Sequence, residues 1–208
     1  MKCILLTGFE DFGGYGKNSS AALMEWVEAD PELFKRYQIR TAILDVTYTG
    51  AFKKWKRVFE TFQPDLAVSF GLSWETNEVK LERIALNLDD CLLPDNKDVL
   101  RLDKPIDKNA PPALRTLLPI KRIHNRLLNA GIPVKISNHA GAYLCNHIFF
   151  TGLTYVGQLP APVPFGFIHL PPLVEQLEPL NRSGVTKDQL LQMVRIVIET
   201  SLRSTRAN

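Results

Sequence analysis

The chain has 208 residues, of which 45% are hydrophobic, and its 25 basic and 22 acidic side chains are mixed along its length to a formal net charge of +3. This composition is typical of a globular protein with a sizeable core, and we expect one domain over residues 1–208. The absence of a basic arm or acidic tail argues against nucleic acid as a partner. No apolar run approaches the ~20 residues of a membrane-spanning helix or forms a signal peptide, so we expect a soluble cytoplasmic protein with no membrane partner.

The cysteines are Cys3, Cys91 and Cys145, an odd number without paired spacing. This usage argues against a disulfide framework. The segment "CNH" at 145–147 holds two potential metal ligands, but no second pair stands at ligand spacing, which argues against a zinc site. We therefore predict no metal.

Apolar segments of strand length alternate along the chain with amphipathic segments of helix length. This alternation predicts an α/β sandwich with a largely parallel sheet. We expect the first helix to be capped by Asn18 or Ser19 and to stop at Asp30-Pro31. Residues 92–112 are rich in Pro, Asp, Asn and Lys without a clear period, which indicates a long ordered loop. In chain order, the expected elements are a strand at 3–8, a helix at 19–30, a strand at 38–46, a helix at 49–62, strands at 65–71 and 79–88, a helix at 119–130, a strand at 133–137, a helix at 145–156, a strand at 165–170 and a helix at 186–204.

Cys145 stands where an apolar helix is expected to begin, after the small residues Ala140 and Gly141. The unpaired N–H groups at a helix N-terminus favour the thiolate form of a cysteine and can also hold a developing oxyanion. Cys145 is therefore a candidate nucleophile, and the alternative is a buried structural cysteine.

A cysteine nucleophile needs a base, and His169 is the best-placed histidine. It ends the apolar strand "FGFIH", and ligands bind at the carboxyl ends of strands in open α/β sheets. His147 follows Cys145 by two helical residues, about 200° around the helix, so the two side chains diverge. His139 lies in the preceding loop and stays open, whereas His124 lies on a basic helix that faces solvent.

Glu82 is the candidate group to orient the base. It lies in the otherwise apolar segment "KLERIALNL", where an acid is unfavourable unless it is paired. Its neighbour Arg83 points to the opposite face of a strand and is therefore not its natural partner.

The turn "TGFEDFGG" presents Phe9 and Phe12 beside two glycines at the end of the first strand. It is neither a dinucleotide-binding fingerprint nor a P-loop. The two aromatic rings could enclose a flat neutral ligand, and core packing is the alternative role.

Together these segments resemble the pyroglutamyl peptidase I family of cysteine peptidases, also called pyrrolidone-carboxylate peptidases. The likeness runs from "TGFEDFGG" with Asn18 through "ERIALN", "LPDN", "TLLPIK" and "GIPVKISNHAGAYLCN" to "GFIHLPPLVEQ", roughly residues 2–176. The resemblance implies a three-layer αβα sandwich with a twisted, mostly parallel sheet, similar to purine nucleoside phosphorylase. It also implies that the enzyme needs no cofactor and commonly forms a homotetramer.

The resemblance further implies an omega peptidase that releases pyroglutamate from the N-terminus of small peptides through an acyl-enzyme. It places a catalytic triad on Cys145, His169 and Glu82. The aromatic residues of the first turn would hold the lactam ring, and backbone groups would bind its amide. The substrate-binding residues implied in this way are Phe9, Phe12, Asn18, Gly71, Leu72 and Leu144.

The sequence departs from the family pattern at four positions. Thr76 and Leu92 replace two arginines, His139 stands where serine is common, and Ser19 replaces a frequent proline. These departures motivate an alternative function, a catalytically weakened or retuned binding protein that recognises pyroglutamate-like ligands. A nucleoside phosphorylase is suggested by fold analogy alone, and the sequence offers no convincing anion site for it.

Overall fold

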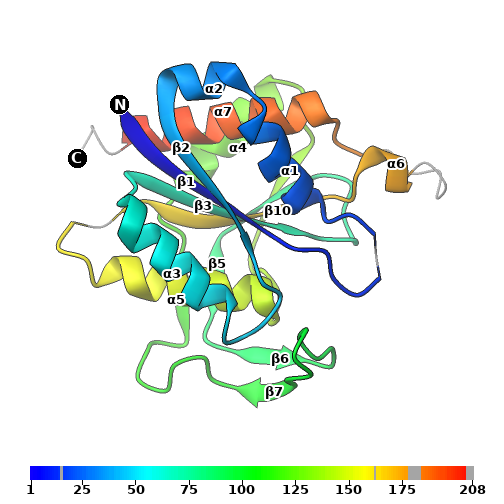
Figure 1. Ribbon diagram of the computed structural model, residues 1–208, viewed down its shortest axis with the longest axis vertical. Helices are drawn as coiled ribbons and strands as arrows, with labels where there is room; N and C mark the ends of the chain where they lie inside the picture. Colours follow the sequence, from blue (N-terminus) through cyan, green and yellow to red (C-terminus); the bar gives the residue numbers. More distant parts are fainter. Residues whose placement is uncertain (15, 162, 178–183, 205–208) are drawn as a thin grey trace.

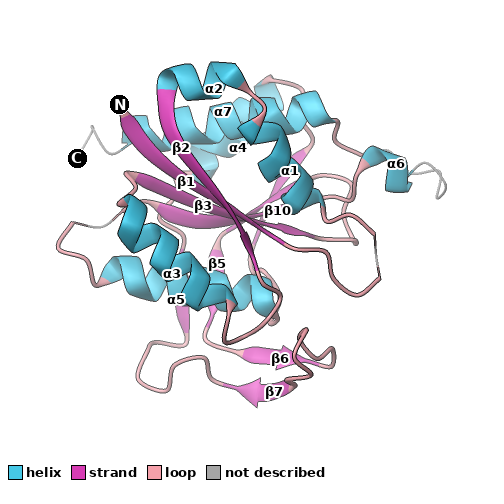
Figure 2. Ribbon diagram, in the orientation of Figure 1, coloured by secondary structure: helices cyan, strands magenta, loops and turns pink. Residues whose placement is uncertain are grey.

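A twisted six-stranded sheet runs through the centre of the computed structural model, which describes residues 1–14, 16–161, 163–177 and 184–204 (Figure 2). The strands lie in the order β2-β1-β3-β10-β4-β9. All neighbouring pairs are parallel except β10 and β4, so the sheet is mixed but mostly parallel, as expected. In sheet order the strands are β2 (Tyr37–Leu44), β1 (Lys2–Phe9), β3 (Leu66–Leu72), β10 (Phe165–Leu170), β4 (Val79–Glu82) and β9 (Val134–Ser137).

Helices cover both faces of this sheet (Figure 1). One face carries α1 (Ser19–Glu28), α2 (Pro31–Arg36), α4 (Ile120–Asn129) and α7 (Lys187–Ser204), and the other carries α3 (Ala51–Phe62) and α5 (Leu144–Gly157). A separate apolar cluster fills each interface, because the central strands are buried on both faces. The short helix α6 (Val174–Leu177) follows β10.

The loop after β1 is tied down where α1 begins. The Asn18 side chain accepts a hydrogen bond from the backbone N–H of Ser20 at 3.0 Å, which confirms the predicted cap. The prediction that Asp30-Pro31 simply ends this helix was incomplete, because Asp30 caps a second helix. Its carboxylate accepts from the N–H of Glu32, and Pro31 occupies the first turn, where a missing N–H does no harm.

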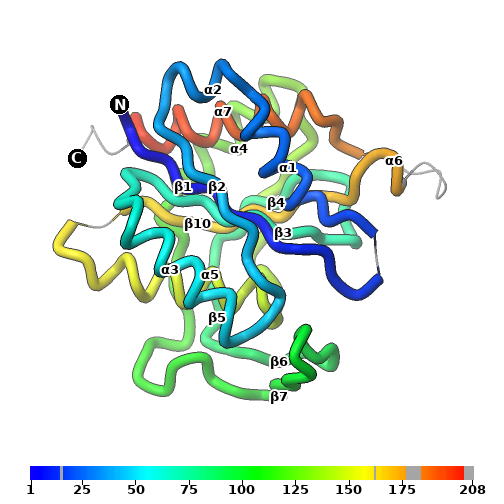
Figure 3. Tube along the Cα trace, in the orientation of Figure 1, coloured from blue at the N-terminus to red at the C-terminus, as the bar shows by residue number. Residues whose placement is uncertain are grey.

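The segment 79–88 was wrongly predicted as one strand, and the segment 92–112 was wrongly predicted to lack regular structure. The chain leaves the sheet after Glu82, and β5 (Ile84–Leu86) pairs with β8 (Ala113–Arg115) outside it. The strands β6 (Asp89–Cys91) and β7 (Arg101–Lys104) then form a hairpin that projects beyond α5 (Figure 3). An alternating pattern shows which residues face a core but does not show where a strand changes its pairing partner.

None of the helices in the described ranges combines the length and the apolar character that a membrane crossing requires.

Candidate active site

The chemically active residues lie near the carboxyl ends of the central strands β3 and β10. His169 of β10 lies directly opposite Gly71 of β3 on one side and Lys80 of β4 on the other. Cys145, in the first turn of α5, lies over the same edge of the sheet. This is the edge at which ligands bind in open α/β sheets.

The sulfur of Cys145 rests on the backbone of Gly71. A Cβ atom added at Gly71 would lie only 2.8 Å from that sulfur, so the position has room for glycine alone. Gly141, with a φ of +79°, turns the chain into the helix that carries the thiol. The N-cap residue Tyr143 makes no side-chain capping bond, which leaves the first N–H groups of α5 available beside the sulfur.

His169 lies between the thiol and a buried carboxylate. Its Nδ1 is 2.8 Å from Oε1 of Glu82, and the two residues are 7% and 1% exposed. Burial by itself lowers the pKa of His169, but the charge of Cys145, the hydrogen bond with that thiol and the Glu82 carboxylate raise it to about 9. The predicted Cys145, His169 and Glu82 are therefore brought together, with the imidazole in the middle.

The other histidines near the thiol have different partners. The buried His147 places Nδ1 2.9 Å from Oδ2 of Asp89, and the same carboxylate oxygen accepts a hydrogen bond from Arg101 at 2.7 Å. His139 is exposed, and its Nδ1 accepts a hydrogen bond from the backbone of Gly141 at 3.2 Å. The divergence of His147 from Cys145 that helix geometry predicts is borne out by this pairing.

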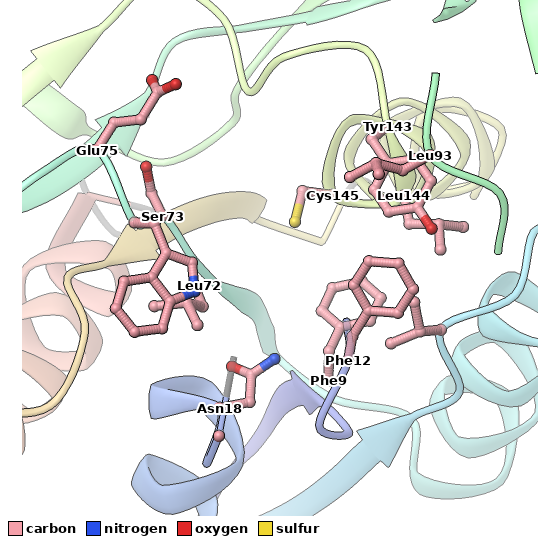
Figure 4. A pocket seen from close by; sticks show the side chains of 13 residues that line it. Phe9, Phe12, Asn18, Leu72, Ser73, Glu75, Leu93, Tyr143, Leu144 and Cys145 are labelled. Carbon is pink, nitrogen blue, oxygen red and sulfur yellow. The ribbon is translucent and has the colours of Figure 1, made fainter. Parts of the chain in front are cut away.

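A pocket of about 310 Å³ opens beside Cys145 (Figure 4). The ring of Phe12 packs against Tyr143 with centroids 5.7 Å apart, and Phe9 lies next to Phe12 in the pocket wall. The wall is largely apolar, and Glu75 is the one carboxylate among the described residues that line it. The lining residues are Phe9, Phe12, Gly16, Asn18, Val46, Leu72, Ser73, Trp74, Glu75, Leu93, Tyr143, Leu144 and Cys145.

The predicted binding residues all reach this region. Five of them line the pocket itself, and the sixth, Gly71, lies beneath the thiol. Asn18 is 7% exposed, and most of its side-chain hydrogen-bonding groups are bonded to neighbouring residues. Its Oδ1 accepts from the N–H and the hydroxyl of Ser20, while its Nδ2 donates one hydrogen to the carbonyl of Glu10 at 3.1 Å. One amide hydrogen of Asn18 remains for a ligand.

Several residues of the pocket wall were not predicted from the sequence. Ser73, Trp74 and Glu75 follow directly after β3, and their place at a strand's carboxyl end was the available signal. Leu93 comes from the segment between β6 and β7, whose position depends on tertiary contacts. One of these is the hydrogen bond that the Tyr143 hydroxyl donates to the carbonyl of Pro94 at 2.9 Å.

A family profile described as pyroglutamyl peptidase matches residues 1–204, nearly the whole chain. The chain belongs to the pyroglutamyl peptidase family. It is accordingly a cysteine-type hydrolase with pyroglutamyl-peptidase activity. The pyrrolidone-carboxylate peptidase of Pyrococcus furiosus is 33% identical over 96% of this chain and 97% of its own length. That of Brevibacillus brevis is 31% identical over 99% of this chain and 95% of its own length.

Solved structures of the pyroglutamyl peptidase family share this fold. The pyrrolidone carboxyl peptidase of Thermococcus litoralis superposes with a TM-score of 0.92 at 30% identity, covering 100% of this chain and 96% of that one. The pyroglutamyl peptidase I of Bacillus amyloliquefaciens gives a TM-score of 0.87 at 27% identity, with 97% of both chains covered. The α/β sandwich predicted from the sequence is confirmed.

Two of the departures from the pyroglutamyl peptidase pattern have a clear structural setting here. Thr76 is 2% exposed, and its hydroxyl donates a hydrogen bond to the carbonyl of Glu78 at 3.0 Å, so it stabilises a turn. Leu92 is 85% exposed and is not among the residues that line the pocket. Neither side chain supplies a positive charge to the site.

Proposed function

We propose that Cys145, His169 and Glu82 form the catalytic triad of this pyroglutamyl peptidase. The observation that carries the proposal is the position of His169, which lies beside the thiol of Cys145 and is hydrogen-bonded through Nδ1 to the buried carboxylate of Glu82. The hydrogen bond between Nδ1 of His169 and Oε1 of Glu82 fixes the ring so that the other nitrogen, Nε2, faces the thiol. The substrates are peptides with an N-terminal pyroglutamyl residue.

In the first step the thiolate of Cys145 attacks the carbonyl carbon that joins pyroglutamate to the next residue. A C–S bond forms, and the electron pair of the carbonyl moves to its oxygen. When the tetrahedral intermediate collapses, the C–N bond breaks and the Nε2 proton of His169 passes to the departing nitrogen. The raised pKa of His169 supports this role, because it keeps the imidazole protonated before the attack.

The negative charge on the carbonyl oxygen needs hydrogen-bond donors that are already in place. The first N–H groups of α5, at Leu144 and Cys145, lie next to the sulfur and have no capping side chain. Donors held in this way at a helix N-terminus stabilise an oxyanion without reorganising during the reaction. We assign the oxyanion site to this turn.

The second step hydrolyses the thioester. His169, now neutral, takes a proton from water, and the resulting hydroxide attacks the acyl carbon. The C–S bond then breaks, pyroglutamate leaves, and the proton on His169 restores the starting ion pair. The Glu82 carboxylate stabilises the imidazolium that is present before the attack and forms again in the second step.

We assign the lactam ring of the substrate to the aromatic side of the pocket, between Phe9 and Phe12. A neutral five-membered ring needs apolar faces and a few hydrogen bonds rather than a charged pocket. We assign the ring's amide to backbone groups of Gly71, which lies beneath the sulfur, and of Leu72 and Leu144, which line the pocket. The spare amide hydrogen of Asn18 offers a further donor.

A fluorogenic assay tests the triad directly. The purified, reduced protein should release aminomethylcoumarin from its pyroglutamyl amide. The Cys145→Ser variant and iodoacetamide treatment should each abolish the signal. Cys3→Ser is the matched control, because Cys3 lies in β1 and its thiol contacts Gln38, away from the pocket, so full activity is expected. Turnover by Cys145→Ser at the wild-type rate would refute the assignment.

We also propose that one catalytic domain spans the chain, that it acts in the cytoplasm and that it assembles as a homotetramer. Support for assembly comes from apolar side chains exposed on and around the β6–β7 hairpin, because clustered exposed leucines mark contact surfaces. Leu92, Leu100 and Leu102 are 85%, 49% and 42% exposed. Light scattering coupled to size exclusion measures the mass, and a monomer at micromolar concentration would contradict the proposed assembly.

A further inference from the structure

A lysine lies beside the proposed catalytic histidine without an assigned role. Lys80 of β4 is the antiparallel neighbour of His169, and its ammonium donates a hydrogen bond to the hydroxyl of Ser73 at 3.0 Å. Ser73 lines the pocket that contains Cys145. The positive charge of Lys80 is therefore held at the edge of the site by a pocket residue.

The ammonium of Lys80 has no carboxylate partner within ion-pair distance in the described part of the chain. Glu82, two residues along the same strand, is bonded to His169, and Glu75 lies exposed on the pocket wall without an ion pair to Lys80. The in-register neighbour on β9, Lys135, differs in this respect, since its ammonium is 2.7 Å from Oε1 of Glu78. A half-buried cation with only a neutral partner is well suited to an anionic ligand.

The order of the strands shows which part of the substrate would meet this cation. Across the sheet, β1 with Phe9 comes first, then β3 beneath the thiol, then β10 with His169, and then β4 with Lys80. The proposed function places the lactam ring on the β1 side. The departing nitrogen must approach His169 to receive its proton, so the residue that follows pyroglutamate extends toward β10 and β4.

The side chains in the pocket agree with this direction. In Figure 4, Ser73 and Phe12 lie on opposite sides of the Cys145 sulfur. The Ser73 oxygen accepts a hydrogen bond from Lys80, which leaves the hydroxyl hydrogen to donate to a substrate oxygen. Ser73 and Lys80 therefore present donors and a positive charge on the leaving-group side.

We propose that Lys80, together with Ser73, binds the residue that follows pyroglutamate. The positive charge of Lys80 favours substrates in which that residue bears a carboxylate next to the scissile bond. A pyroglutamyl dipeptide with a free C-terminus has this chemistry, whereas its C-terminal amide lacks the charge. The inference rests on the proposed function, because it uses the ring site and the proton donor assigned there.

The test compares pyroglutamyl-alanine with pyroglutamyl-alanine amide in the wild type, Lys80→Met, Lys80→Arg and Lys135→Met. The two substrates share the scissile bond, so any loss of folded protein cancels in the ratio of their kcat/KM values. We expect Lys80→Met to lower the acid-to-amide ratio by about fivefold, which is what a partly exposed ion pair contributes, and mainly through KM. Lys80→Arg should keep most of the preference.

Lys135→Met is the matched control, since it removes the same charge from the neighbouring strand, where the cation already has Glu78 as its partner. Its acid-to-amide ratio should equal that of the wild type. An unchanged ratio in Lys80→Met, or an equal fall in Lys135→Met, would overturn the inference while the amide is still hydrolysed and the proposed function stands. If the wild type hydrolysed neither peptide, the proposed function would fail, and this inference with it.

Discussion

Gly71 provides the space in which the catalytic sulfur sits, so replacing it with alanine should damage catalysis more than folding. The added Cβ would meet the Cys145 sulfur at 2.8 Å and Cζ of Phe167 at 2.9 Å. The first of these distances is about 0.6 Å shorter than the 3.4 Å at which ordinary contact begins. The sulfur, which lies at the free end of a side chain, must therefore move away from its place.

The size of the effect follows from this displacement. A misplacement of about 1 Å between reacting groups lowers a rate by about 10²-fold, so we expect Gly71→Ala to lose roughly 10- to 100-fold in kcat/KM. Overpacking a buried position destabilises a protein by about 1–3 kcal/mol. Most of the protein should therefore remain folded at 25 °C while the activity of each folded molecule falls.

The assay measures kcat/KM on the pyroglutamyl coumarin amide together with the free energy of unfolding in urea. Gly166→Ala is the matched control in the adjacent strand. Its Cβ would come within 2.5 Å of Oγ1 of Thr116 and 2.6 Å of Cδ1 of Leu118, which lie outside the site. We expect this control to lose stability but to keep its activity per folded molecule.

Two results would refute this reasoning. One is a Gly71→Ala variant with the kcat/KM of the wild type, which would mean that the sulfur position is not critical. The other is an equal loss of activity per folded molecule in Gly166→Ala, which would mean that any overpacking of the sheet disturbs the site. The rate of Cys145 alkylation by iodoacetamide reports the displaced sulfur independently.

Three further predictions concern the charges around the site. His169 must carry a proton to release the leaving group, and its pKa is raised to about 9. We therefore expect kcat/KM to fall as the pH rises through about 9. A pH profile of kcat/KM without this fall on the alkaline side would contradict the prediction. Glu82→Gln should lower kcat by on the order of 10²- to 10⁴-fold with little change in KM, measured by steady-state kinetics, because the imidazolium loses its partner. Asp89→Asn should reduce the free energy of unfolding, measured in urea, by about 3 kcal/mol, because the buried carboxylate pairs with His147 and Arg101. The fall of kcat/KM near pH 9 should stay at the same pH in this variant.

Those parts of the fold that depend on local patterns could be predicted from the sequence. Buried strands such as β3 and β10 appear as short apolar runs, and the cap at Asn18 is a local signal. The departure of the chain from the sheet after Glu82 could not be predicted. There the N–H of Arg83 donates to the carbonyl of Ser137, and the N–H of Thr116 donates to the carbonyl of Arg83, so partners far along the chain fix the bend.

In the site, too, some positions follow from local sequence and others depend on how the strands pair. The place of Cys145 in the first turn of a helix and of His169 near the end of a strand follows from local sequence. The approach of Glu82 to the histidine depends on β4 running antiparallel beside β10, which periodicity does not reveal. Glu82 was a candidate because an acid in an apolar segment needs a partner, and the resemblance to the family implied that this partner is His169. The position of Lys80 next to His169 arises from the same register and was not foreseen.

The geometry also explains why the thiol works with a histidine 24 residues downstream rather than with the one two residues away. On α5, His147 points away from the sulfur and is held by Asp89, so it helps to fix the pocket wall that the β6–β7 hairpin completes. The helix supplies Cys145 and its N–H donors, while the sheet register places His169 beside Lys80 and Glu82 of β4. Because the nucleophile and the base belong to different elements, the packing interface between α5 and the sheet controls the distance between Cys145 and His169. Substitutions at that interface, such as Gly71→Ala, should therefore affect catalysis more than substitutions elsewhere in the core that lower the free energy of unfolding by the same amount.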